Sequence, residues 1–184
     1  MSDAVPPAEG AFATSGPDDV RTSLTAAAAL LAPAHRAVTE RVLHAFDHPE
    51  AYVHDHADRL ADRGIDEAVP DLAWTALIDA LADHRLLAEF DWKEDSQEVR
   101  SQLNGLDSRP SVDPWVLVEE KEMLLPTYEF LEACGRHYGD VGAALVVLDI
   151  ESDCYPVVCL PAARVRELAA LTKRAGFNAW ALGL

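Results

Sequence analysis

The chain has 184 residues, of which 49% are hydrophobic, and carries a formal net charge of −17 at pH 7. A chain of this length and composition can bury a core without disulfides or metals. The 32 acidic residues against 15 basic ones disfavour binding to nucleic acid or to an anionic membrane surface, because both require lysine and arginine to meet phosphate. The charge fits a basic protein partner, or serves solubility alone.

Helical signals dominate the first part of the chain. Residues 1–19 are rich in alanine, proline, glycine, serine and aspartate, a composition that predicts a disordered tail. Residues 20–69 are expected to form a helical extension. Pro33 either breaks the helical pattern or starts a second helix, and Pro49 can start another helix running to about Arg63, because proline lacks an amide proton but fits the first helical turn.

Residues 70–184 are predicted to form an α+β domain. Apolar residues recur at spacings of three and four between Leu72 and Leu81, which is typical of an amphipathic helix. Residues 86–92 alternate between apolar and polar and indicate a short strand. The segments 94–106 and 124–138 are predicted helices.

The last part of the chain changes to the period of strands. Residues 143–149 and 155–160 are apolar runs joined by a few polar residues, which predicts a hairpin. A helix from Pro161 to Ala175 follows, and the alternating segment 177–182 could return as an edge or third strand. The expected fold is α+β: a helical N-terminal part followed by a small, mainly antiparallel sheet with flanking helices.

An acidic turn connects the two strands of the predicted hairpin. Asp149, Glu151 and Asp153 occupy every second position, so in an extended strand they would share one face, and with Asp91 they could ligate a hard divalent cation. The segment must turn, however, and the calcium-loop pattern is not met, because no glycine follows Asp153. A solvated turn is favoured, in which Asp and Ser side chains bond their own backbone. A partner-binding turn and a metal site are the alternatives.

A second pattern with metal-ligand residue types lies in the helical part. The sequence H-x-H-x-D at His54, His56 and Asp58 resembles part of the metallo-β-lactamase metal motif, but Arg59 stands where that motif continues with histidine. On a helix, His56 would lie about 200° around the axis from His54. A surface helix is therefore expected. The chain has no G-x-S-x-G, Walker or G-x-G-x-x-G pattern, and no cofactor is expected.

Cysteine usage and the N-terminal sequence indicate a cytoplasmic protein. The three cysteines are an odd number, which is a poor disulfide framework, and we expect all three to be small apolar fillers. The N-terminus has no positively charged signal region. No apolar run is long enough to span a bilayer. The tryptophans Trp74, Trp92 and Trp180 are predicted to be core residues.

Two longer stretches carry a resemblance. L-I-D-A-L-A-D-H-R-L-L-A-E-F-D-W-K-E-D (residues 77–95) and L-V-V-L-D-I-E-S-D-C-Y-P-V-V-C-L-P (residues 145–161), the second followed by a helix and A-G-F, resemble a bacterial domain family of unknown function. D-W-K-E and D-x-x-S-D-x-Y-P are the most specific parts. The resemblance covers roughly residues 70–184 and implies a small cytoplasmic α+β domain, without an activity or catalytic residues.

Together these features predict a non-enzymatic, acidic interaction module, comparable in class and charge with immunity proteins that block cationic toxin domains. The expected contact residues are Trp92, Asp149, Glu151, Asp153 and Tyr155. The alternative is a divalent-metal-binding domain or a metal-dependent hydrolase, with Asp91, Asp149, Glu151 and Asp153 as ligands. A third hypothesis is a small-molecule sensor with Trp92 and Trp180 lining a pocket.

Overall fold

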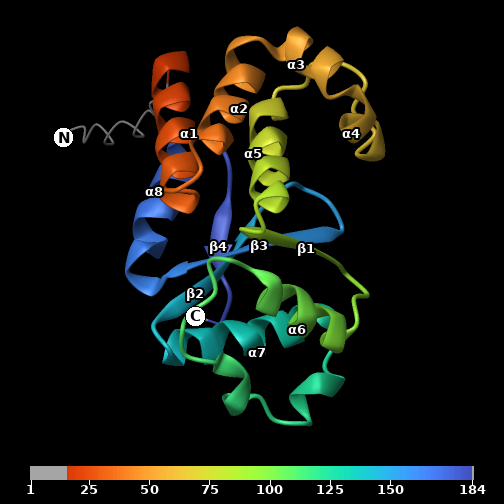
Figure 1. The fold of residues 1–184 in the computed structure, drawn as a ribbon, viewed down its shortest axis with the longest axis vertical. Coiled ribbons are helices and arrows are strands. Elements are labelled where there is room, and N and C mark those ends of the chain that lie inside the picture. The colour runs from red at the N-terminus through yellow and green to blue at the C-terminus, as the bar shows by residue number, and fades with distance from the viewer. Residues whose placement is uncertain (1–15, 184) are drawn as a thin grey trace, which may run out of the picture.

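A four-stranded antiparallel sheet with the strand order β1-β3-β2-β4 runs through the middle of the molecule (Figure 1). The computed structural model describes residues 16–183. Helices α1, α2, α5 and α8 lie on one side of the sheet, and α6 and α7 lie on the other (Figure 1). The strands are β1 (Leu87–Asp91), β2 (Ala143–Leu148), β3 (Cys154–Pro161) and β4 (Ala179–Ala181). The α+β class and the mainly antiparallel sheet with flanking helices are therefore confirmed.

The two central strands are apolar on both faces, and this creates two hydrophobic cores. Every residue of β2 is buried, as expected for a strand with helices on both sides. Val146 and Leu148 belong to the core beneath α1, α2, α5 and α8. Leu145 and Val147, which point the opposite way because side chains alternate along a strand, belong to the core beneath α6 and α7.

The N-terminal helices begin and end where proline and the apolar pattern indicate. Pro17 occupies the first turn of α1, which ends before Pro33, and Pro49 begins α3. The segment predicted as one helix up to Arg63 is instead two short helices that meet at His56. The bounds are α1 (Pro17–Leu31), α2 (Arg36–Asp47), α3 (Pro49–Asp55), α4 (Ala57–Asp62), α5 (Leu72–Asp83) and α8 (Val165–Arg174).

The N-terminal part shares its core with the sheet. Leu24 of α1, Val38 of α2 and Leu77 of α5 lie in one cluster of buried residues with Val146 and Val158 of the sheet. Most of the predicted tail, residues 1–15, lies outside the described residues, and Pro17 to Asp19 form the first turn of α1. None of the helices within residues 16–183 has the length and hydropathy of a membrane-spanning segment.

The opposite layer connects β1 to β2. Asp95 caps α6, where its carboxylate accepts a hydrogen bond from the Gln97 amide at 2.8 Å, a capping role that aspartate performs well. Phe90 of β1 and Phe130 of α7 are both fully buried in this core. The elements are α6 (Ser96–Gly105), α7 (Thr127–Asp140) and the 3₁₀ turns η1 (Pro114–Leu117) and η2 (Glu122–Leu124), with a third, η3 (Ala162–Arg164), between β3 and α8.

The strand register determines which loops meet. Val147 pairs with Val157 in the β2–β3 hairpin, and Asp91 pairs with Cys154 where β1 runs beside β3. On the other side of β2, the edge strand β4 begins where Leu148 pairs with Ala179. The turn of residues 149–153 therefore lies at the same end of the sheet as the end of β1 and the start of β4.

Helix α7 offers a matched pair of glycines that tests this packing. A Cβ at Gly135 would overlap the backbone carbonyl of Leu182, whereas a Cβ at Gly139 would meet no atom within 4 Å. We expect Gly135→Ala to lower the free energy of unfolding by about 1–3 kcal/mol, as overpacking does. Gly139→Ala should leave it unchanged or raise it by up to about 1 kcal/mol, because alanine is the better helix former. Urea denaturation measures both, and equal effects would contradict the close approach of the C-terminal segment to α7.

Candidate functional site at the acidic end of the sheet

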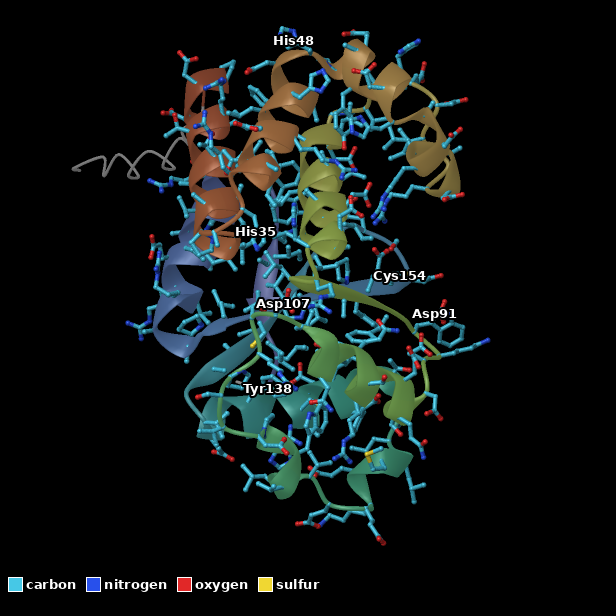
Figure 2. All side chains as sticks on the ribbon, in the orientation of Figure 1. His35, His48, Asp91, Asp107, Tyr138 and Cys154 are labelled. Atoms are coloured by element: carbon cyan, nitrogen blue, oxygen red, sulfur yellow. The ribbon has the colours of Figure 1, made fainter. Side chains whose placement is uncertain are left out.

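The stretches D-W-K-E and D-x-x-S-D-x-Y-P meet at one end of the sheet. Phe90 pairs with Tyr155 and Asp91 with Cys154 along β1 and β3. One residue further, the Trp92 amide donates to the Asp153 carbonyl at 3.1 Å. Figure 2 shows Asp91 and Cys154 together at this end. Two segments that are far apart in the sequence thus form one surface, which we call the acidic end: residues 91–94 and 149–155.

Hydrogen bonds hold the acidic turn in a fixed conformation. The Asp149 carboxylate accepts a hydrogen bond from the Glu151 amide at 2.9 Å, and the Ser152 hydroxyl accepts one from the Cys154 amide at 3.2 Å. Glu151 has a φ of 52°, in the left-handed region that few residues other than glycine adopt. The expected bonding of Asp and Ser side chains to their own backbone is therefore confirmed.

The first residue of the turn is also fixed from outside. The indole Nε1 of Trp74, on α5, donates to the Asp149 carbonyl at 2.6 Å, and the Asp149 amide donates to the Asn178 carbonyl at 3.0 Å. Trp74 is 1% exposed, so its indole proton needs a partner inside the protein. The Asp149 backbone is thereby held between α5 and the segment that leads into β4.

The carboxylates of the turn do not converge on a common point. Among residues 16–183, no group of three or more His, Cys, Asp or Glu side chains is arranged to hold a metal ion. Asp91 is engaged with the Lys93 amide at 2.9 Å, and Asp149 with the Glu151 amide. The alternative set of Asp91, Asp149, Glu151 and Asp153 gains no geometric support.

The histidine pattern does not form a metal site either. Because α3 ends at Asp55 and α4 begins at Ala57, His56 occupies the junction between two helices. Its ring stacks on Tyr52 with a centroid separation of 4.1 Å, and its Nδ1 lies 3.1 Å from the Tyr52 carbonyl oxygen. The His54 side chain is exposed and lies beside Asp55.

The tryptophans differ from one another in exposure. Trp74 is buried, as predicted, but the core prediction is wrong for Trp92 and Trp180, which are 51% and 37% exposed. Trp92 follows the last residue of β1, and Trp180 lies on the edge strand β4. The two tryptophans thus belong to opposite edges of the sheet.

Exposed aromatic rings border the acidic turn on the α7 side. Tyr128, at the start of α7, lies 5.4 Å from the ring of Tyr155 and is 36% exposed. Burial, followed by the nearby carboxylate of Glu132, raises the pKa of the Tyr128 hydroxyl. We call the set of Trp92, Tyr128, Tyr155 and Trp180 the aromatic rim. Sequence reasoning missed Tyr128, because its place in a helical pattern does not reveal that it faces the end of the sheet.

On the α5 side, the turn borders a cleft of about 520 Å³, which we call the turn cleft. Asp149 and Glu151 line it from the turn, Asp71 and Trp74 line it from the start of α5, and Phe177 lines it from the segment after α8. The acidic turn therefore has a hollow on one side and exposed aromatic rings on the other. This cleft joins three segments that are distant in sequence, so no local pattern predicts it.

Comparison with known proteins gives a family. A family model described as "Domain of unknown function (DUF6630)" matches residues 23–182. The chain belongs to this family. The resemblance expected for the segment after residue 70 is thus confirmed, and the match also includes the N-terminal helices, which the expected resemblance left out. No curated protein and no solved structure matches the chain.

Ion pairs of Arg63 join helices and sheet of the DUF6630 domain close to the acidic end. Arg63 binds the buried carboxylate of Asp79 on α5 at 2.7 Å and Glu89 on β1 at 2.8 Å. Burial disfavours the Arg63 cation, but the hydrogen bonds to Glu89 and Asp79 outweigh this, so its pKa lies above the ordinary value. The guanidinium is committed within the protein. Its role in the described structure is to join the chain after α4 to α5 and β1.

The thiols of the DUF6630 domain are free and unactivated. Cys134 and Cys159 are buried, as expected for apolar fillers, and burial raises the pKa of each to about 12. Cys154 is half-exposed, which differs from that expectation. Burial raises the pKa of Cys154, and the carboxylates of Glu89 and Asp91 raise it further. Because the thiolate is the nucleophilic form, these surroundings disfavour nucleophilic chemistry at Cys154.

The arrangement of the turn predicts the outcome of a metal titration. We expect the melting midpoint of the EDTA-treated protein to stay within about 1 °C when millimolar Ca²⁺, Mg²⁺, Mn²⁺ or Zn²⁺ is added, because the carboxylates do not converge. An ion at about 100 times its dissociation constant would add about 2.7 kcal/mol and raise the midpoint by several degrees. A saturable rise with one ion, lost in Asp153→Asn, would contradict this and favour the metal-binding alternative.

Proposed function

We propose that the protein is a non-enzymatic interaction module that binds a basic protein partner through its acidic end. The observation that carries the proposal is the exposure of Trp92, at 51%, next to the acidic turn. Tryptophan and tyrosine dominate binding hot spots because they bury a large rigid surface on association. The exposed ring of Trp92 is stabilised within the protein by Lys93, whose Nζ lies 4.1 Å from the ring centroid, and a partner would bury it further.

Charge supports a basic partner. Asp149, Glu151 and Asp153 form no ion pair with any residue of the described range 16–183. Carboxylates that form no internal ion pair are available to lysine and arginine of another protein. The net charge of −17 adds long-range attraction, which speeds association and weakens with salt.

The class of protein that best combines these properties is an immunity-type inhibitor, which neutralises a cationic toxin domain by covering it. Such a protein needs no catalytic groups, only an acidic surface with a few aromatic anchors. The parallel with these inhibitors rests on the class of protein and its charge, and not on a common fold. At the acidic end, the aromatic rim would supply the anchors and the acidic turn would supply the charge.

Variants that avoid the turn cleft test the proposal. The partner is captured on the immobilised protein from a lysate of the native host at about 50 mM salt and is then purified for affinity measurements. We expect Trp92→Ala to weaken its binding about 30-fold, the cost of losing a hot-spot side chain worth about 2 kcal/mol. Asp153→Asn should weaken it a few-fold and reduce its salt dependence.

Two substitutions elsewhere on the surface serve as controls. Val116, on η1, is 78% exposed. Glu50 is exposed and belongs to α3, a helix that lies away from the sheet in Figure 1. Val116→Ala and Glu50→Gln should change the dissociation constant by less than about twofold. Equal losses in the controls and in the acidic-end variants, or binding that salt does not weaken, would refute the proposal.

A further inference from the structure

The turn cleft has a rigid aromatic wall. The rings of Trp74 and Phe177 stack with a centroid separation of 4.7 Å and an interplanar angle of 4°. Trp74 is held by its hydrogen bond to the Asp149 carbonyl at 2.6 Å. Phe177 is half-buried and lines the cleft directly after Gly176, whose φ of 87° is a conformation that glycine adopts without strain. The wall is therefore preorganised and does not need to rearrange to receive a ligand.

Only negative charge lines the cleft. Asp71, Asp149 and Glu151 contribute carboxylates, and no lysine, arginine or histidine is among the lining residues. None of the three acids forms an ion pair within residues 16–183. One oxygen of Asp149 accepts the Glu151 amide, which leaves its second oxygen available to a ligand. The cleft thus combines the half-buried ring of Phe177, which rests on the buried ring of Trp74, with carboxylates that form no ion pair.

We propose that the turn cleft receives an arginine side chain of the basic partner; this inference rests on the proposed function. A guanidinium is planar, weakly hydrated and able to stack on an aromatic ring while it donates to carboxylates in its own plane. A lysine ammonium is compact and strongly hydrated, so it gains less from an aromatic wall. In this arrangement the guanidinium lies against Phe177 and donates to Asp149 and Glu151.

A single-residue probe isolates the cleft from the rest of the interface. The probe is N-acetyl-arginine N′-methylamide, with the corresponding lysine and citrulline compounds for comparison; citrulline has nearly the same shape as arginine but no charge. The 184-residue chain has four tryptophans, and the indole N–H signal of Trp74, assigned with Trp74→Phe, reports directly on the cleft wall in a ¹H–¹⁵N spectrum. We expect the arginine compound to shift this signal saturably, the lysine compound to bind more weakly, and the citrulline compound to leave it unchanged.

Two double variants with the same change in net charge separate specific binding from general attraction. Asp149→Asn/Glu151→Gln should weaken binding of the arginine compound about tenfold, because two ion pairs are lost. Asparagine can still accept the Glu151 amide, so the turn is retained. Asp66→Asn/Glu67→Gln neutralises two exposed acids that do not line the cleft and should weaken binding by less than about twofold.

The outcomes distinguish this inference from the proposed function. An unmoved Trp74 signal, an equal response to citrulline, or an equal loss in Asp66→Asn/Glu67→Gln would overturn the arginine site. Binding of the protein partner that still depends on Trp92 and Asp153 would then leave the proposed function standing. A saturable shift of the Trp74 signal, lost in Asp149→Asn/Glu151→Gln alone, would support the arginine site even if the capture experiment returned no partner.

Discussion

The pairing of β3 with a neighbour on each side is the constraint on which the rest of the structure depends. Because β3 lies between β1 and β2, its first residues lie beside the last residues of both. The register that pairs Asp91 with Cys154 places Trp92 next to the acidic turn. The hydrogen bond from Trp74 to the Asp149 carbonyl then connects this end of the sheet to α5. A change of register by one residue would exchange the side chains that β3 contributes to the two cores.

Arginines in the N-terminal half of the chain form ion pairs with acids inside the protein. Three arginines from α2, from α4 and from the end of α4 are paired with acids of α5 and β1, through the contacts Arg41–Asp83, Arg59–Asp83, Arg63–Asp79 and Arg63–Glu89. The carboxylate of Asp79 is almost completely buried, where an unpaired charge would be costly. The acids in the turn of residues 149–153 have no such ion-pair partners within residues 16–183. The paired acids of α5 and β1 are therefore neutralised within the protein, whereas the acids at the end of the sheet can bind a cation of another molecule.

Most helices and strands were predicted correctly, because each depends on residues that are close together in the sequence. The apolar runs around Val146 and Val158 indicated the hairpin, the spacing from Leu72 to Leu81 indicated α5, and Pro49 marked the start of α3. The division at His56 was not predicted, because no proline or glycine marks it in the sequence.

The composition of the site depends on contacts between distant segments, which periodicity does not encode. The sequence did not show which strand lies beside the hairpin, and that neighbour decides where Trp92 is placed. Trp92 and Trp180 were expected in the core because tryptophan is highly buried on average, yet they lie at the edges of the sheet and are partly exposed. The sequence did not indicate Tyr128 and Phe177 as site residues, because their neighbours Tyr155 and Trp74 are distant in the sequence and come close only in the folded chain.

The central claim is that a basic partner recognises the acidic end, and zero-length cross-linking tests it most directly. A carbodiimide activates a carboxyl group, which then forms an amide bond with the lysine amine and releases a urea, and this coupling occurs only where the two side chains are in contact. With the complex captured at low salt, mass spectrometry should find the partner's lysines joined to Asp149, Glu151 or Asp153, with such links lost at high salt. Links concentrated instead on the exposed acids of α3 and α4, such as Glu50 and Asp58, would show that the partner binds elsewhere and would contradict the account.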